Sequence, residues 1–275
     1  MNTYLNYNKQ IDGLRFIAIT GVLLQHLIPK DFELIKKLPL GAGVHLFFVI
    51  SGFLITKILL SNKDKLVSKK GTTKMLRAFF YKRTLRIFPI YYGLLAFLLI
   101  IGFQNVYDVW GWVVSYSVNI YQSLKLPYIG SFNHMWSLAV EEQFYLVWPF
   151  LLLFTPRKHT LKVIFFLIIA AILFKTTYFL MYGPGPAIKT LAISCGDSLG
   201  FGALVAYLQL YKPNILNKIN SIPFLVFISF LPYLLLVVIP LGPTFIPQVY
   251  STFLFSLFSF TIICKASKEE FRNPV

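Results

Sequence analysis

Two ionisable residues, Arg15 and His26, stand in an apolar stretch that runs from Ile11 to Ile28. On a helix, their separation of eleven residues is close to three turns, so the two side chains would share one face, about 16 Å apart along the axis. Ionisable groups are costly inside a lipid bilayer and usually face a protein interior or a polar path. The pair therefore predicts a functional site on this helix face.

A second apolar stretch, which begins at Trp136, carries the adjacent acids Glu141 and Glu142. If this helix enters the membrane from the outer face, the two carboxylates lie about 8 Å below that face. His26 is expected at the same depth near the outer end of its own helix, and Asp197 is expected there at the start of a later one. A histidine beside a carboxylate in a low-dielectric cavity can act as a general base.

Arg83 and Arg86 precede another apolar stretch, on the side of the membrane where Arg15 is expected. Residues three apart on a helix lie on one face, so the two guanidinium groups could grip phosphate groups there. Their default role would be to set the membrane topology. The residues alone leave both interpretations open.

The composition is typical of an integral membrane protein. Of the 275 residues, 57% are hydrophobic and only 13% are charged, which is about half the charge of a typical soluble domain. Stretches near the length needed to cross a bilayer recur along the whole chain. They predict an all-α, polytopic transmembrane helical bundle of about eight spans, forming a single domain over residues 1–275. The predicted spans are 13–29, 42–60, 87–103, 136–154, 163–181, 194–210, 222–240 and 247–264.

Two segments between these spans are expected to lie at the membrane surface. The segment 110–122 is short and polar for a span, and we interpret it as interfacial or re-entrant. The Lys-rich loop 61–86 is expected to end in an amphipathic helix that lies on the membrane.

The net charge of +16 has a topological explanation. With a cytoplasmic N-terminus, most of the 26 Lys and Arg residues fall in loops on the inner side, as the positive-inside rule requires. A nucleic-acid interface would need basic residues on a soluble face with interleaved aromatics, and the sequence does not predict one. We therefore expect a multi-pass protein of the cell (inner) membrane whose surroundings are the lipid bilayer.

The remaining unusual residues favour structural roles. Cys195 and Cys264 lie in apolar segments at opposite predicted depths, which indicates packed thiols rather than a disulfide or a metal pair, and no metal site is predicted. Lys175 lies within a span and could pair with an acid such as Asp197 as a structural bridge. The first apolar stretch lacks a signal-peptide cleavage pattern and is expected to be a retained helix.

Four segments of the chain, in the same order, resemble motifs of membrane acyltransferase family 3, the O-acyltransferases that modify bacterial surface polysaccharides. The first, Ile11-Asp12-Gly13-Leu14-Arg15 with His26, is similar to the family's Arg-x10-His motif. The others are 43–55, 83–89 and 134–149, the last running from His134-Met135-Trp136-Ser137 through Glu141-Glu142-Gln143-Phe144-Tyr145 to Trp148-Pro149.

The resemblance implies an O-acetyltransferase that takes an acyl group, acetyl by default, from cytoplasmic acyl-CoA. It implies that Arg83 and Arg86 bind the CoA phosphates and that Arg15 guides the thioester arm. Acyl-CoA is then a co-substrate, and no permanently bound cofactor is expected.

On the outer side, the resemblance implies that His26 deprotonates a carbohydrate hydroxyl with help from Glu141 or Glu142. Four further residues are predicted to contact this acceptor: Trp136, Ser137, His134 and Asp197. The acceptor, a carbohydrate or a lipid-linked glycan, is left open among lipopolysaccharide, capsule, exopolysaccharide, peptidoglycan and smaller glycosides.

The chain departs from the family pattern at two places. The second-helix motif often carries an acid where this chain has His45. Family members are also longer, so the chain is expected to be a shortened or C-terminally truncated member that lacks their last helices.

Two other functions stay open at the level of the sequence. Buried His, Arg and Glu residues also build proton relays, as in a proton-coupled transporter or a glycan flippase. A truncated member could instead be a non-catalytic interaction protein.

Overall fold

The computed structural model describes residues 8–27, 39–63, 69–103, 106–124, 130–239, 242 and 244–268. Within these ranges the regular elements are all helices, and no strand occurs. The prediction of an all-α protein is therefore confirmed.

The helices follow one another with short connections. In order they are α1 (Lys9–Leu27), η1 (Leu40–Ala42), α3 (Gly43–Lys63), α4 (Lys69–Ile100), α5 (Val106–Val114), α6 (Val118–Ser123), η2 (Gly130–Met135), α7 (Trp136–Phe154), η3 (Arg157–His159), α8 (Thr160–Tyr182), α9 (Ala187–Thr190), α10 (Gly196–Tyr211), α11 (Pro213–Ser221), α12 (Leu225–Val238) and α13 (Phe245–Lys268).

In the described part of the chain, five helical segments are long and apolar enough to cross a membrane. They are Leu40–Lys63, Gly71–Ile100, Phe132–Phe154, Arg157–Tyr182 and Phe245–Ser267. The pair α11 and α12, which bends by 72°, makes a sixth if it forms one span. The chain is thus a multi-pass helical membrane protein, while the count of eight spans and the cytoplasmic N-terminus stay predictions.

The two other predicted spans correspond to α1 and α10. The apolar stretch of α1 follows Lys9, Asp12 and Arg15, and residues 28 and 29 of its predicted span lie outside the described residues. The 16 residues of α10 cover about 24 Å, which is less than the roughly 30 Å of a bilayer core. Because other helices surround α10, protein rather than lipid covers most of its length.

The surface helix expected before the third span is not separate from that span. The structure has one continuous helix, α4, that includes Pro89 and passes through both segments. A proline within a helix removes one backbone hydrogen bond but does not have to end the helix. The segment 110–122 instead forms the end of α5 and most of α6, both too short to span a bilayer.

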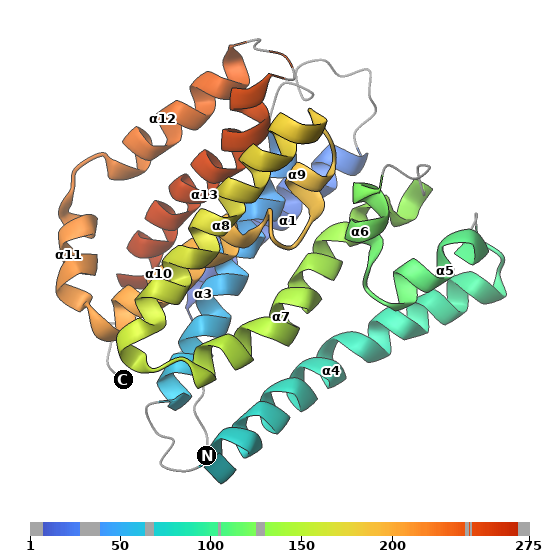
Figure 1. Ribbon diagram of the computed structural model, residues 1–275, viewed down its shortest axis with the longest axis horizontal. Coiled ribbons are helices and arrows are strands. Elements are labelled where there is room, and N and C mark those ends of the chain that lie inside the picture. Colours follow the sequence, from blue (N-terminus) through green and yellow to red (C-terminus); the bar gives the residue numbers. More distant parts are fainter. Residues whose placement is uncertain are drawn as a thin grey trace.

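The main bundle is built around α3 and α10, which pack along each other (Figure 1). α8 and α13 pack against α10, and α1 packs against α3. α7 lies along α3 on the side toward α4, between α4 and the main bundle (Figure 1). Asn8 donates a hydrogen bond to the carbonyl of Ala266 at 3.1 Å, so the start of α1 meets the end of α13 at one face.

Glycines let α3 and α10 approach until their backbones touch. A Cβ atom added to Gly202 would stand 1.9 Å from the carbonyl oxygen of Val49, and one added to Gly52 would stand 2.1 Å from that of Leu199. Packing through small residues is a common way for helices to associate in a membrane, where the hydrophobic effect does not drive their contact.

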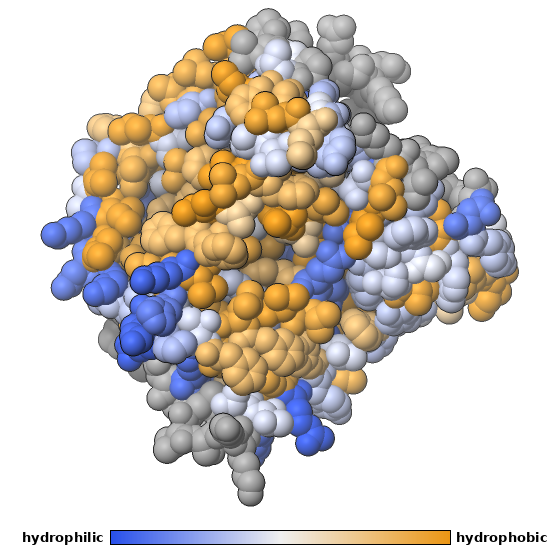
Figure 2. Space-filling view, viewed as in Figure 1, coloured by the Kyte–Doolittle hydropathy of each residue, from blue (hydrophilic) through white to orange (hydrophobic). Residues whose placement is uncertain are grey.

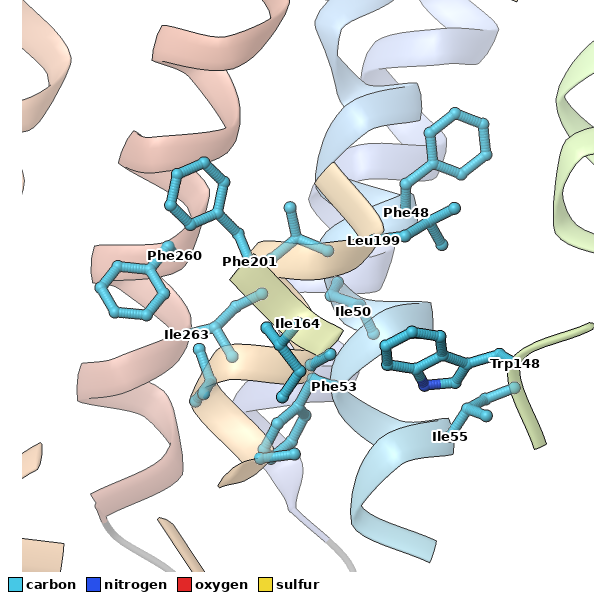
Figure 3. Close-up of a cluster of buried hydrophobic side chains, with 14 of the residues drawn as sticks. Phe48, Ile50, Phe53, Ile55, Trp148, Ile164, Leu199, Phe201, Phe260 and Ile263 are labelled. Atoms are coloured by element: carbon cyan, nitrogen blue, oxygen red, sulfur yellow. The ribbon is translucent and has the colours of Figure 1, made fainter. Parts of the chain in front are cut away.

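Large side chains fill the remaining space in the bundle. Figure 3 shows Phe53 and Ile55 of α3, Trp148 of α7, Ile164 of α8 and Phe260 of α13 within one cluster. The Trp148 indole N–H donates to Thr56 Oγ1 at 2.8 Å, which satisfies its polar atom within the core. A second hydrophobic cluster joins α4, α5, α6 and the first turns of α7, so α7 contributes to both.

The outer surface agrees with a membrane protein. Figure 2 shows a largely apolar face, with hydrophilic residues gathered at one end of the bundle near α11 and the connection from α7 to α8. Exposed basic residues of these elements are Arg157, Lys158, Lys162, Lys212 and Lys218. All five belong to the side on which the sequence predicts the cytoplasmic loops.

The α3–α10 contact predicts that Gly202→Ala destabilises the protein, because the new methyl group must push two backbones apart. We expect a loss of about 3 kcal/mol or more, at the upper end for overpacking. Thermal unfolding of the detergent-solubilised chain measures it. The matched control is Gly93→Ala in α4, where a Cβ atom meets nothing within 4 Å and alanine is the better helix former. Equal unfolding temperatures for the two variants would contradict the role of this contact.

Candidate active site

Glu141 is held by hydroxyl groups from two helices. Ser51 of α3 donates to Glu141 Oε1 at 2.7 Å, and Tyr145 donates to Oε2 at 3.0 Å. Glu141 and Tyr145 lie four residues apart on α7 and therefore share a face. The neighbour of Ser51 is Gly52, so the contact between α3 and α10 also fixes where this hydroxyl stands. We call Ser51, Glu141 and Tyr145 the carboxylate cluster.

Arg83 lies against this cluster. Its guanidinium carbon is 3.4 Å from the centre of the Tyr145 ring and 5.5 Å from that of Phe79. The charges of Arg83 and Arg15 both act on Glu141. Arg15 also forms an ion pair with Asp12 at 2.7 Å, one turn earlier on α1, and both side chains are 36% exposed. Arg86 is exposed to the surroundings.

Glu142 points to the other side of α7. Its charge acts on the hydroxyl groups of Tyr92 and Tyr116, and it interacts electrostatically with Arg83 and Glu141. Glu142 Oε1 is buried and has no hydrogen-bond partner within the described residues. Two adjacent acids thus face different surroundings, because successive residues of a helix point about 100° apart.

His26 has a defined tautomer. Its Nδ1 atom lies 2.8 Å from the carbonyl oxygen of Val22. A carbonyl oxygen can only accept, so Nδ1 carries the proton and Nε2 keeps a free lone pair. The His26 side chain is exposed, and its ring centre lies 6.3 Å from that of His134.

The pairing of His26 with a carboxylate is not formed. Within the described residues neither Glu141 nor Glu142 makes a hydrogen bond with His26. The rise per residue predicts depth along a helix axis, but it does not specify the direction in which each side chain points. The structure instead brings Glu141 and Glu142 to Arg83, which was predicted at the inner boundary.

His134, which lies in η2 just before α7, is the residue of this segment that approaches His26. Ser137 Oγ donates to the carbonyl of His134 at 3.2 Å, and the Trp136 ring meets the Phe48 ring edge-on at 6.0 Å between centres. His134 is exposed, whereas Trp136 and Ser137 are partly buried. Their predicted role as acceptor contacts stays a prediction.

Asp197 belongs to a different cluster. Its carboxylate lies 2.5 Å from Lys175 Nζ, and both side chains are almost fully buried. Lys175 also donates to Thr252 Oγ1 at 2.7 Å. The structural bridge between Lys175 and Asp197 is therefore present. The Asp197 carboxylate, which was predicted to contact the acceptor, is not exposed.

The buried bridge continues into a polar network around His45. His45 Nδ1 lies 3.1 Å from Ser198 Oγ, which lies 2.6 Å from Ser256 Oγ. Ser256 donates to the Thr252 carbonyl at 2.7 Å. The His45 side chain is thus part of the packed core of the main bundle.

Several of these partners carry no strong signal in the sequence. Ser51 belongs to a motif-like segment but is only one small hydroxyl residue among apolar neighbours, and it gains importance through its distance to Glu141. Tyr145 could have been found from its spacing of four residues to Glu141. Within the described residues, no three His, Cys, Asp or Glu side chains are grouped as metal ligands would be.

Comparison with known proteins agrees with the motif-like segments. A family model described as an acyltransferase domain matches residues 8–268. The peptidoglycan O-acetyltransferase OatA of Listeria monocytogenes is 32% identical over 199 residues, which are 65% of this chain and 30% of that protein. The O-acetyltransferase OatA of Staphylococcus aureus is 31% identical over 172 residues, 55% of this chain and 26% of that protein.

A putative O-acetyltransferase of Staphylococcus aureus is 31% identical over 170 residues, which are 54% of this chain and 25% of the relative. The matched part of the chain thus spans about a quarter to a third of the length of these curated relatives. No solved structure matches the chain.

The Lys175–Asp197 bridge predicts that the double replacement destabilises the protein much less than either single replacement. Lys175→Met or Asp197→Leu alone leaves one buried charge uncompensated and is expected to cost about 3–5 kcal/mol of stability. The double variant removes both charges and should recover most of that loss, as measured by thermal unfolding in detergent. If the two single losses simply added in the double variant, the bridge would not be the reason for them.

Proposed function

We propose that this chain, which belongs to the acyltransferase domain family, transfers an acetyl group from acyl-CoA to a hydroxyl of a cell-envelope carbohydrate. The family and the O-acetyltransferase names of its relatives support an acyl transfer in the membrane. The name of the Listeria relative favours peptidoglycan among the possible acceptors.

The tautomer of His26 carries this proposal. The Val22 carbonyl holds the proton on Nδ1, and the lone pair of Nε2 is left on an exposed side chain. A neutral imidazole in this state can accept the proton of a hydroxyl group. The hydroxyl oxygen then attacks the thioester carbon, an O–acyl bond forms, and the C–S bond breaks. The departing thiolate takes up the proton that His26 has accepted.

The two carboxylates act electrostatically in this scheme. The hydrogen bonds of Glu141 go to Ser51 and Tyr145 rather than to His26. We therefore assign Glu141 and Glu142 a through-space role, in which their negative charge stabilises the positive charge that develops on the imidazole as it accepts the proton.

Three arginines are proposed to meet the donor. Arg86 is exposed near the predicted cytoplasmic side and is free of the aromatic contacts that hold Arg83, so it is the better phosphate ligand of the two. Arg83 and Arg15, whose charges both act on Glu141, are proposed to guide the thioester arm of the donor. In this orientation the N-terminus lies in the cytoplasm and the chain spans the inner membrane. Both statements are part of the proposal.

A proton-coupled transporter or glycan flippase is the alternative, since Arg83, Glu141 and Glu142 also make a charged group within the membrane. The two functions differ in what they consume. Acyl transfer releases free CoA in proportion to the acylated glycan, whereas a transporter moves its cargo with the proton gradient and without CoA.

His26→Ala is expected to lower acyl transfer about 100-fold or more, because it removes the general base. Membrane vesicles that contain the full chain receive acetyl-labelled CoA, and the label in the glycan is counted. His159→Ala is the matched control, since His159 is the last residue of η3 and takes no part in the site. A His26→Ala chain that transfers at the full rate would refute this role, and gradient-dependent flux without CoA release would favour the transporter.

A further inference from the structure

Three tyrosines surround the turn between α5 and α6, and two of them have clear structural roles. The Tyr91 hydroxyl donates to the carbonyl of Val113 at 2.7 Å, and the Tyr92 hydroxyl donates to that of Val114 at 3.0 Å. These hydrogen bonds tie the end of α5 to α4. Each hydroxyl is thereby satisfied by a backbone carbonyl near the end of a helix.

Tyr116, the third tyrosine, has a strained backbone. Its φ is +51°, in the left-handed region that bulky residues rarely adopt. The side-chain amide of Gln143 donates to its carbonyl at 2.9 Å, and its ring stacks on that of Tyr91 with 4.3 Å between centres. Such strain persists only where the surroundings fix it, and it clusters at functional sites.

The Tyr116 hydroxyl is buried without a hydrogen-bond partner in the described part of the chain. The residue as a whole is 8% exposed. Burial raises the pKa of the Tyr116 phenol, and the nearby Tyr91 and Glu142 raise it further. The phenol therefore keeps its proton and remains able to donate it in a hydrogen bond.

Glu142 Oε1 is a second buried atom without a hydrogen-bond partner within the described residues. The next residue, Gln143, donates to the Tyr116 carbonyl and so holds this turn of α7 against Tyr116, and the Glu142 charge acts on the Tyr116 hydroxyl. The two atoms come from different elements, α7 and the turn between α5 and α6. A buried polar atom left unpaired is costly, so two of them on elements that contact each other point to a group that pairs with both.

We propose that Tyr116 and Glu142 form a subsite for a neutral hydroxyl group of a substrate, which donates to Glu142 Oε1 and accepts from the Tyr116 hydroxyl. Only a group that is both donor and acceptor satisfies both atoms. Glu142 and Arg83 carry opposite charges that offset each other, so the pair gives the subsite no preference for an anion or a cation. This inference rests on the proposed function and deepens it, because both the sugar acceptor and the pantetheine arm of acyl-CoA carry such a hydroxyl.

Binding without turnover tests the subsite. The full chain in detergent is titrated with acetyl-CoA, or with a short soluble oligomer of N-acetylated hexosamines, and the rise in its unfolding temperature reports affinity. Tyr116→Phe keeps the ring and its stacking but removes the hydroxyl. We expect about tenfold weaker binding of at least one probe, the factor for one hydrogen bond, and the probe affected identifies the source of the hydroxyl.

The stability of the free protein separates binding from structure. Tyr116→Phe should not lower the unfolding temperature without a probe, because its hydroxyl has no partner to lose. Tyr91→Phe is the matched control: it removes the hydroxyl hydrogen bond to the Val113 carbonyl, so it should lower stability and leave probe affinity unchanged. Glu142→Gln should weaken binding of the same probe as Tyr116→Phe, because an amide offers the ligand hydroxyl a weaker acceptor than a carboxylate.

The subsite is overturned if neither probe stabilises the unaltered chain. It is also overturned if Tyr116→Phe keeps full affinity for both probes, or loses affinity together with stability. A chain whose probe binding depends on Tyr116 but which transfers no acetyl would contradict the proposed function and leave the subsite standing. If instead the chain transfers acetyl and its Tyr116→Phe variant binds both probes unaltered, the proposed function stands and the subsite is refuted.

Discussion

Gly52 and Gly202 let the backbones of α3 and α10 come into contact, and the positions of the polar side chains follow from that contact. Ser51, next to Gly52, reaches Glu141 of α7. Ser198, one turn before Gly202, reaches His45 and the bridge between Lys175 and Asp197. In a membrane, close packing and hydrogen bonds must hold helices together, and here the same pair of glycines permits both.

α7 divides the charged residues between two surroundings. One face packs into the main bundle, and Glu141 on that face receives two hydroxyl hydrogen bonds. The next residue, Glu142, faces the cluster of α4, α5 and α6 and keeps one buried oxygen unpaired. Arg83 lies near both carboxylates. One helix thus presents a satisfied acid and an unsatisfied acid at almost the same depth.

Hydrophobicity predicted the all-α membrane fold class and the bounds of α7, because both depend on composition along the chain. Helical rise predicted the partner of Lys175, because it gives the distance of each residue along its helix. They could not predict which way a side chain points around the helix axis. That is why Glu141 was expected beside His26 but is bonded to Ser51, and why Arg83 was expected at the inner boundary but stacks on Tyr145. The length of α4 was also missed, because its basic first half is too polar to be recognised as part of a span.

The bridge between Lys175 and Asp197 bears on how the chain enters the membrane. The two residues are 22 positions apart, on α8 and α10, which the short α9 connects. Each charge alone in lipid is costly, and pairing lowers that cost. α8 and α10 are therefore favoured to move into the bilayer together, as a hairpin that is already paired, rather than one after the other.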